Sequence, residues 1–229
     1  EIFALVSKNE AEIKRGKPET KKNSAGYALW SVMPEGVNKF KKGVGTFDLT
    51  RLISGSQGTI GIITNITMRA LPIPQNTTLI AVPIFNLEDA ASCITEALKY
   101  NPINVEIFDA LTFDLALRNP SFFKDRMPLS QYYKVMLSMY TTYHVRYRRK
   151  IPEFTILVTI DDETAIETEP SLIAKNISSS KVKARVITNP NEAEMYWQLR
   201  RASYSLSKFQ DVTKRPAAFL EDVTVPPEN

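Results

Sequence analysis

The sequence is poor in the residues that build disulfides and metal centres. It contains one cysteine, Cys93, and one histidine, His144, among 229 residues. A single cysteine cannot form a disulfide within the chain, and metal sites need clustered His, Cys or carboxylate ligands. A metal centre built by this chain alone is therefore not expected. We expect Cys93 to be a small buried residue of a helix, because no basic side chain flanks it to activate the thiol.

Long hydrophobic runs are also missing. No apolar stretch is long enough to cross a bilayer, and residues 1–15 lack the charged, apolar and small segments of a signal peptide. We therefore expect a soluble, cytoplasmic protein. The net charge is +4, and basic residues cluster in residues 12–23 and 146–150. No aromatic stacking pattern accompanies these clusters, so we interpret them as solvated faces and expect no nucleic-acid partner. His144 lies beside the second cluster and away from any motif, and we assign it no catalytic role.

Glycine is scarce, yet three of the eight glycines lie within the stretch GSQGTIGIIT, at Gly55, Gly58 and Gly61. A dinucleotide fingerprint places its glycines after a strand and before a helix, where the helix N-terminus meets the pyrophosphate. Here the order is reversed, because a short helix that Asp48 can cap precedes the glycines and a β-branched run follows them. Two interpretations stay open: a simple turn at the start of a strand, or a loop whose bare backbone approaches a flat or anionic ligand.

Hydrophobic periodicity predicts the remaining organisation. Residues 1–8 and 59–74 are expected to be strands, and from residue 78 the order is strand, helix, strand, loop, strand, helix, strand, helix. This order predicts an α+β domain with an antiparallel or mixed sheet and helices packed on one face. The last helix, residues 189–209, begins at the capping residue Asn189. Its expected buried stripe is Met195, Leu199, Ala202, Leu206 and Phe209.

Several motifs together resemble one family. The chain has Lys22, Asn23, Gly26 and Tyr27, then FDLTRLISGSQGTIGIIT over residues 47–64, then Pro72 and Pro74. This order is similar to the K-N-x-x-G-Y, D-L-x-x-L-x-x-G-S-E-G-T-L-G-I-I-T and P-x-P patterns of FAD-linked oxidases of the D-lactate dehydrogenase and glycolate oxidase type. Further downstream, residues 104–113, 195–202 and 219–229 resemble the V-E-x-x-D, W-x-x-R-E and E-D-V-x-V-P segments of that family.

The resemblance implies a division into two parts. Residues 1–74 would form the second half of an FAD-binding domain of the PCMH type, and residues 75–229 the first part of an α+β substrate (cap) domain that continues beyond Asn229. The upstream glycine-rich loop of the family does not occur in this sequence, so we expect an interior fragment that by itself neither binds FAD tightly nor turns over. Gln57 stands where the family usually has glutamate. The FAD contacts that the resemblance implies are Gly55, Ser56, Gln57, Gly58, Thr59, Gly61 and Ile62.

The resemblance also implies the reaction, which is oxidation of a small 2-hydroxy acid by hydride transfer to the flavin. Arg200 matches the arginine of W-x-x-R, to which binding of the substrate carboxylate is attributed in some members, and Tyr204 shares its helix face. Without the resemblance, Arg200 would be interpreted as a solvated helix residue. The electron acceptor and the catalytic base stay unassigned. Gln57 and Arg201, which replaces a glutamate of the family, also permit an alternative: a non-enzymatic remnant or interaction module that has lost the cofactor.

Overall fold

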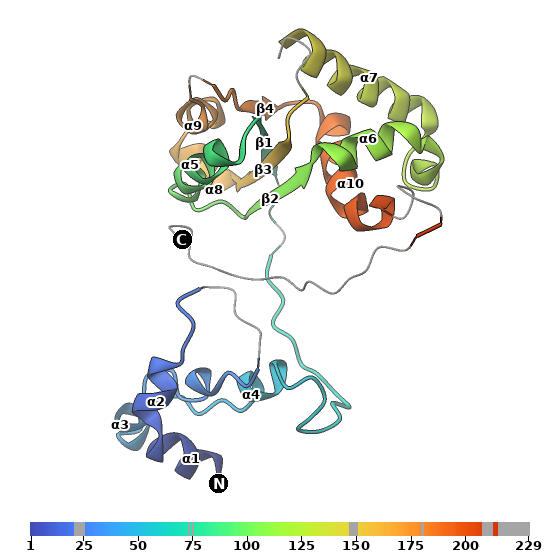
Figure 1. The fold of residues 1–229 in the computed structure, drawn as a ribbon. Coiled ribbons are helices and arrows are strands. Elements are labelled where there is room, and N and C mark those ends of the chain that lie inside the picture. Colours follow the sequence, from blue (N-terminus) through green and yellow to red (C-terminus); the bar gives the residue numbers. More distant parts are fainter. Residues whose placement is uncertain are drawn as a thin grey trace. The chain divides into compact units, whose positions relative to one another are not determined.

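The computed structural model describes residues 1–20, 26–72, 74, 76–146, 151–179, 181–207 and 213–214, without the side chains of residues 143–146, 204 and 207 (Figure 1). The chain divides into two compact units, Glu1–Leu71 and Pro72–Phe219. We describe each unit by itself.

Unit 1 is built from short helices. They are α1 (Ile2–Lys8), α2 (Glu10–Arg15), the 3-10 helix η1 (Leu29–Ser31), α3 (Val37–Lys41) and α4 (Thr50–Ser54). Its core contains Val6, Val32, Met33, Val37 and Leu52. The rings of Phe3, Phe40 and Phe47 pack beside this core, with centroids 5.6 to 6.5 Å apart. So small a core binds these helices together mainly through aromatic and aliphatic contacts.

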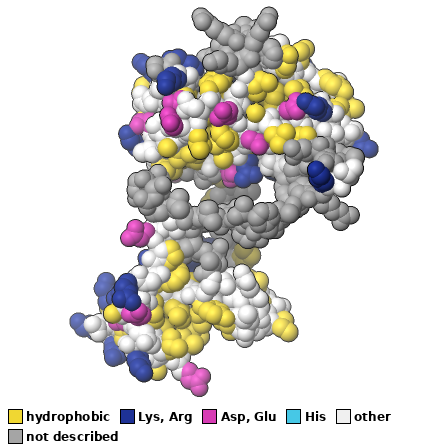
Figure 2. Space-filling model, viewed as in Figure 1, with side chains coloured by type: hydrophobic (Ala, Val, Ile, Leu, Met, Phe, Trp, Pro, Cys, Tyr) yellow, Lys and Arg dark blue, Asp and Glu magenta, His cyan; other side chains and the backbone are white. Residues whose placement is uncertain are grey.

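Both strands that were expected in unit 1 are absent from its described residues. Residues 2–8 form α1, which turns Phe3 and Val6 toward one core, as a helical period allows. Residues 61–72 have no regular secondary structure, and Ile62 is 93% exposed and Met68 83% exposed. A strand needs a neighbour to bind its backbone, and the described part of unit 1 supplies none. Figure 2 shows that hydrophobic side chains reach the visible surface of this unit.

Unit 2 contains a four-stranded antiparallel sheet. Its strands are β1 (Thr77–Ile84), β2 (Asn104–Asp109), β3 (Phe154–Asp161) and β4 (Arg185–Ile187), in the order β2-β3-β1-β4. The helices are α5 (Leu87–Leu98), α6 (Ala110–Arg118), α7 (Leu129–Arg146), α8 (Asp162–Glu167), α9 (Pro170–Ile177) and α10 (Pro190–Ser207), with the 3-10 helix η2 at Pro120–Phe123. The predicted α+β class and antiparallel sheet are confirmed.

Helices cover both faces of this sheet, so the prediction of a single helical face is wrong (Figure 1). Alternate residues of β3 point to opposite sides: Ile156 and Val158 join the core under α5 and α9, whereas Leu157 joins the core under α6, α7 and α10. Residues 110–146 contribute to this second layer, although the order predicted from the sequence gives them only the end of a strand and a loop. They form α6, η2 and α7, and Asp109 begins α6 by accepting a hydrogen bond from the Thr112 backbone N–H at 2.9 Å.

Several local predictions are confirmed. Cys93 is buried on α5, its Sγ donates to the Ile177 carbonyl at 3.5 Å, and burial raises the pKa of its thiol. Asn189 caps α10, since its Oδ1 accepts hydrogen bonds from the backbone N–H groups of Asn191 and Glu192. The predicted stripe of α10 is buried at Met195, Leu199, Ala202 and Leu206. Phe209 lies outside the described residues.

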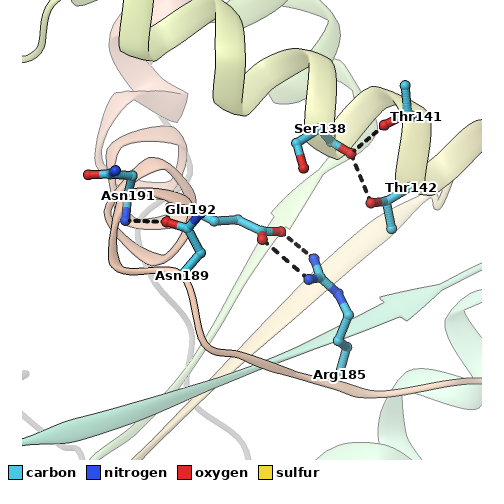
Figure 3. Close-up of polar contacts among 7 residues, drawn as sticks. All are labelled: Ser138, Thr141, Thr142, Arg185, Asn189, Asn191 and Glu192. Carbon is cyan, nitrogen blue, oxygen red and sulfur yellow. Dashed lines mark hydrogen bonds and ion pairs between the residues drawn. The ribbon is translucent and has the colours of Figure 1, made fainter.

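An ion pair fastens the start of α10 to the sheet. Both terminal nitrogens of Arg185 on β4 bind the Glu192 carboxylate, one of them at 3.3 Å (Figure 3). The Glu192 side chain is 10% exposed and the Arg185 side chain 24% exposed. Removing one member of an ion pair this buried strongly lowers the free energy of unfolding, because the other charge stays buried without its partner. The pair therefore fixes where α10 leaves the sheet edge.

The burial of Tyr132 on α7 predicts a pH dependence. Its hydroxyl donates to the Ala116 carbonyl and its ring stacks on Phe123 at 5.2 Å, and burial raises the pKa of Tyr132 to about 12. The unfolded chain releases this proton near pH 10, so the free energy of unfolding should fall between pH 10 and 12, by up to about 1.4 kcal/mol per pH unit. When urea unfolding is measured at several pH values, the free energy of unfolding of Tyr132→Phe should fall less steeply between pH 10 and 12 than that of wild type. The exposed neighbour serves as control, and an equal flattening in Tyr133→Phe would contradict the prediction.

The Arg185–Glu192 pair predicts a difference between two neighbouring glutamates. Glu192→Ala should lower the free energy of unfolding by about 3 kcal/mol, because it leaves the guanidinium of Arg185 without its buried partner. Glu194→Ala removes the exposed pair with Arg201 and an exposed hydrogen bond from Gln198, and should cost less than about 1 kcal/mol. Urea denaturation followed by circular dichroism measures both values. Equal losses in the two variants would show that Glu192 has no special structural role.

Candidate functional site

The glycine-rich stretch forms a tight turn directly after α4. The Asp48 carboxylate accepts a hydrogen bond from the Thr50 backbone N–H at 2.9 Å, but Leu49 is the N-cap residue of α4, so the prediction that Asp48 caps this helix is wrong by one residue. After the helix, Gln57 and Gly58 have positive φ angles of 49° and 80°. The Thr59 backbone N–H closes the turn on the Ser56 carbonyl at 3.0 Å. Two successive residues in the left-handed region make a compact bend with its peptide groups turned outward.

A hydrogen bond connects this turn with the preceding motif. The hydroxyls of Tyr27 and Thr59 lie 2.7 Å apart, although 32 positions separate the two residues in the sequence. Thr59 Oγ1 also lies 2.6 Å from the Ser56 carbonyl, to which it donates. Tyr27 belongs to the G-Y pair of the first motif, whereas Lys22 and Asn23 lie outside the described residues. Thus two motifs that resembled the same family meet in one place.

The turn fits a ligand that approaches the backbone closely. Among the described residues, no heavy atom lies within 4 Å of the position that a Cβ would take at Gly58 or at Gly61. Gly58 is required by its positive φ, but Gly61 has no such backbone requirement. Within the same described part, the backbone N–H groups of Gln57 and Gly58 donate no hydrogen bond. The turn therefore leaves these backbone groups accessible to a ligand that approaches the main chain.

A pocket with charged side chains of both signs adjoins the turn within unit 1. It has a volume of about 470 Å³ and is lined by Gly55, by the cations Lys17 and Arg51, and by Glu19. Arg51 also contacts the Asp48 carboxylate at 3.6 Å. With Glu19 in the lining and Asp48 at Arg51, two carboxylates face the two cations, so charge alone indicates no ligand for this pocket.

In unit 2, Arg200 meets Glu106. Arg200 Nε donates to Glu106 Oε2 at 2.8 Å, and the two side chains are 39% and 37% exposed. Arg200 lies on α10 and Glu106 on β2, 94 residues apart. A partner on the sheet therefore holds the arginine. The interpretation of Arg200 as a freely solvated helix residue did not include such a partner. Sequence reasoning missed Glu106 as a site residue, although the V-E-x-x-D segment contains it.

The guanidinium of Arg200 keeps open donors. Within the described residues, its Nη1 and Nη2 atoms have no hydrogen-bond partner. Ser203, on the next turn of α10, lines a groove of about 330 Å³ together with Ile107, Leu111 and Phe154. The groove is mostly apolar, but Asp109 also lines it and Arg200 is not one of its lining residues. Tyr204 lies on α10, and its side chain is outside the described part.

Other candidate sites find no support in the described residues. There, no group of three His, Cys, Asp or Glu side chains could hold a metal ion. The side chain of His144 and residues 219–229 lie outside the description. No helix of the described part is both long and apolar enough to traverse a membrane. Arg201 pairs with Glu194 at 2.7 Å on the exposed side of α10.

Known proteins resemble this chain over different stretches. A D-2-hydroxyglutarate dehydrogenase of Haemophilus influenzae is 24% identical over the whole chain, which spans 21% of that protein. A D-lactate dehydrogenase of Archaeoglobus fulgidus is 30% identical over 47% of the chain, corresponding to 26% of the relative. The glycolate oxidase subunit GlcD of Bacillus subtilis is 34% identical over 32% of the chain and 16% of the relative. The chain thus covers only a minor part of each of these proteins.

The family match falls on unit 2. Residues 73–229 match the family described as FAD linked oxidases, C-terminal domain, which is more than half of the chain. FAD is the cofactor of this family. The Arg200–Glu106 pair and the two-sided antiparallel sheet both lie within the matched residues. The chain therefore belongs to the FAD linked oxidases.

Proposed function

We propose that this chain is an interior part of an FAD-dependent oxidoreductase that oxidises a small 2-hydroxy acid of the D-lactate or glycolate type. The observation that carries the proposal is the guanidinium of Arg200, which lies at the position of the family's W-x-x-R arginine, is held through Nε, and has no partner for its Nη atoms among the described residues. The names of the relatives agree in the chemical class, because lactate, glycolate and 2-hydroxyglutarate are all 2-hydroxy acids. Residues 1–74 would belong to the FAD-binding domain and residues 75–229 to the substrate domain.

In this proposal the glycine turn binds the flavin. The open N–H groups of Gln57 and Gly58 would donate to it, and the bare backbone at Gly61 would let it approach closely. Gln57 can still donate and accept hydrogen bonds but lacks the charge of the family's glutamate. Bound FAD supplies the hydride acceptor, and the protein supplies binding and orientation. The residues assigned to this role are Gly55, Ser56, Gln57, Gly58, Thr59, Gly61 and Ile62.

Substrate binding is assigned to α10. The Nη atoms of Arg200 would bind the substrate carboxylate with two parallel hydrogen bonds, which fixes the orientation of the acid as well as its presence. Tyr204, four residues further along the helix, is assigned to the same site. The groove lined by Ile107 and Leu111, and also by Asp109, would take a short hydrocarbon part of the acid on its apolar side. The carbon that loses hydrogen is thereby held by its neighbouring carboxylate, which reduces the entropy lost at the reaction step.

Gly61 provides a test of cofactor binding that does not depend on turnover. In the full-length parent protein, Gly61→Ala and Gly61→Val should weaken FAD binding by about tenfold or more, because a side chain would occupy the path of the flavin. The melting temperature of the flavin-free protein should stay unchanged, since among the described residues beyond its two chain neighbours no atom meets that side chain. Gly16→Ala, at an ordinary helix end of the same unit, is the control. Flavin fluorescence titration that gave equal affinities for Gly61→Val and wild type would contradict the assignment.

The reaction class is tested by the flavin itself. The full-length parent is mixed without oxygen with D-lactate, glycolate, D-2-hydroxyglutarate and a bulkier 2-hydroxy acid while the visible flavin absorption is recorded. Bleaching by at least one acid is the expected result. A flavin band that no acid bleaches would contradict the substrate class. Absence of any flavin would favour a remnant that has lost its cofactor.

A further inference from the structure

We propose that Glu106 is the positioning residue of Arg200, which it holds through Nε so that only the two terminal nitrogens can receive the substrate carboxylate. This inference rests on the proposed function, in which Arg200 binds that carboxylate. Glu106 itself touches neither substrate nor flavin in this account. It acts by fixing the plane of the guanidinium before the acid arrives.

The hydrogen-bond geometry restricts how a carboxylate can approach. Nε carries a single N–H, and Glu106 Oε2 accepts it at 2.8 Å. A bidentate carboxylate can bind a guanidinium along the edge that includes Nε or across the end that carries both Nη atoms. Because Glu106 occupies Nε, the end-on approach is the one that stays open. The pair therefore selects one orientation of the bound acid.

Both partners stand on fixed elements. Glu106 lies in β2, opposite Leu157 of the central strand β3. Arg200 follows the fully buried Leu199 of α10, whose start is fastened by the Arg185–Glu192 pair. A free arginine has many side-chain conformations, and binding would have to select one of them. Glu106 restricts that freedom in advance, so that substrate binding loses less entropy.

The neighbouring pair on α10 shows what Glu106 adds. Arg201 and Glu194 lie on the same helix and are 56% and 49% exposed. This pair connects two residues of a single helix, whereas Arg200 and Glu106 connect the helix to the sheet. An exposed pair within one helix orders its arginine weakly. Glu194 is therefore the matched control for Glu106.

The test uses the full-length parent and a double-mutant cycle. Glu106→Ala should raise the dissociation constant of acetate or pyruvate, neither of which donates a 2-hydroxy hydride, by about tenfold. The KM of the oxidised acid should rise similarly, with kcat changed less than about twofold. Glu106→Gln keeps an acceptor for Nε and should stay within about threefold of wild type. Glu194→Ala should leave both constants unchanged.

The cycle distinguishes positioning from a general structural effect. In the Arg200→Ala background, adding Glu106→Ala should have no further effect on carboxylate binding. An equal loss in that background, a loss of kcat with constant KM, or wild-type behaviour of Glu106→Ala would overturn the inference. The comparison is valid if the variants melt at the same temperature as wild type. If Glu106→Ala unfolds, the conservative variant Glu106→Gln takes its place.

Failure of the proposed function gives a different result. If wild type binds acetate or pyruvate through Arg200 but no 2-hydroxy acid bleaches its flavin, the substrate class is wrong. The binding cycle still decides the role of Glu106. If Arg200→Ala leaves carboxylate binding unchanged, the assignment of Arg200 is wrong and the inference on Glu106 is overturned with it.

Discussion

The pairing of β1 with β3 is the interaction on which unit 2 depends. Eight residue pairs join the two strands, from Thr77 opposite Asp161 to Ile84 opposite Phe154. Because both faces of this pair are covered, each strand sends alternate side chains into two separate cores. β2 is held at one side of β3, and α10 packs across the same sheet face as α6 and α7. The position of Glu106 relative to Arg200 follows from that arrangement.

Local patterns predicted the elements that local forces determine. The apolar run of β3, the Asn189 cap and the buried stripe of α10 each follow from neighbouring residues, and the structure contains them. The strands expected at residues 1–8 and 59–74 were wrong because a strand depends on a partner, which β-branched composition does not supply. The helices of residues 110–146 were missed for a related reason. In α7 the buried Tyr132, Val135, Met136 and Met139 follow helical spacing, but the exposed apolar residues Tyr133, Leu137 and Tyr140 hide that pattern in the sequence.

The candidate sites also contain some features that the sequence predicts and others that only the folded chain brings together. Glycine spacing alone left the turn at Gly55–Thr64 ambiguous, and the resemblance to a family directed attention to it and to Arg200. The hydrogen bond from Tyr27 to Thr59 and the pair of Arg200 with Glu106 span 32 and 94 positions, so they depend on the folded chain. Glu106 lay within a recognised segment, but no local rule connected it with a distant arginine. Long-range electrostatic pairs are the part of a site that sequence patterns predict least.

A crystal structure of the full-length parent with a bound 2-oxo acid would test the central claim most directly. The account predicts that both Nη atoms of Arg200 lie within hydrogen-bond distance of the carboxylate while Nε stays on Glu106. A carboxylate bound away from Arg200, or an arginine that has left Glu106 to bind it through Nε, would contradict the account.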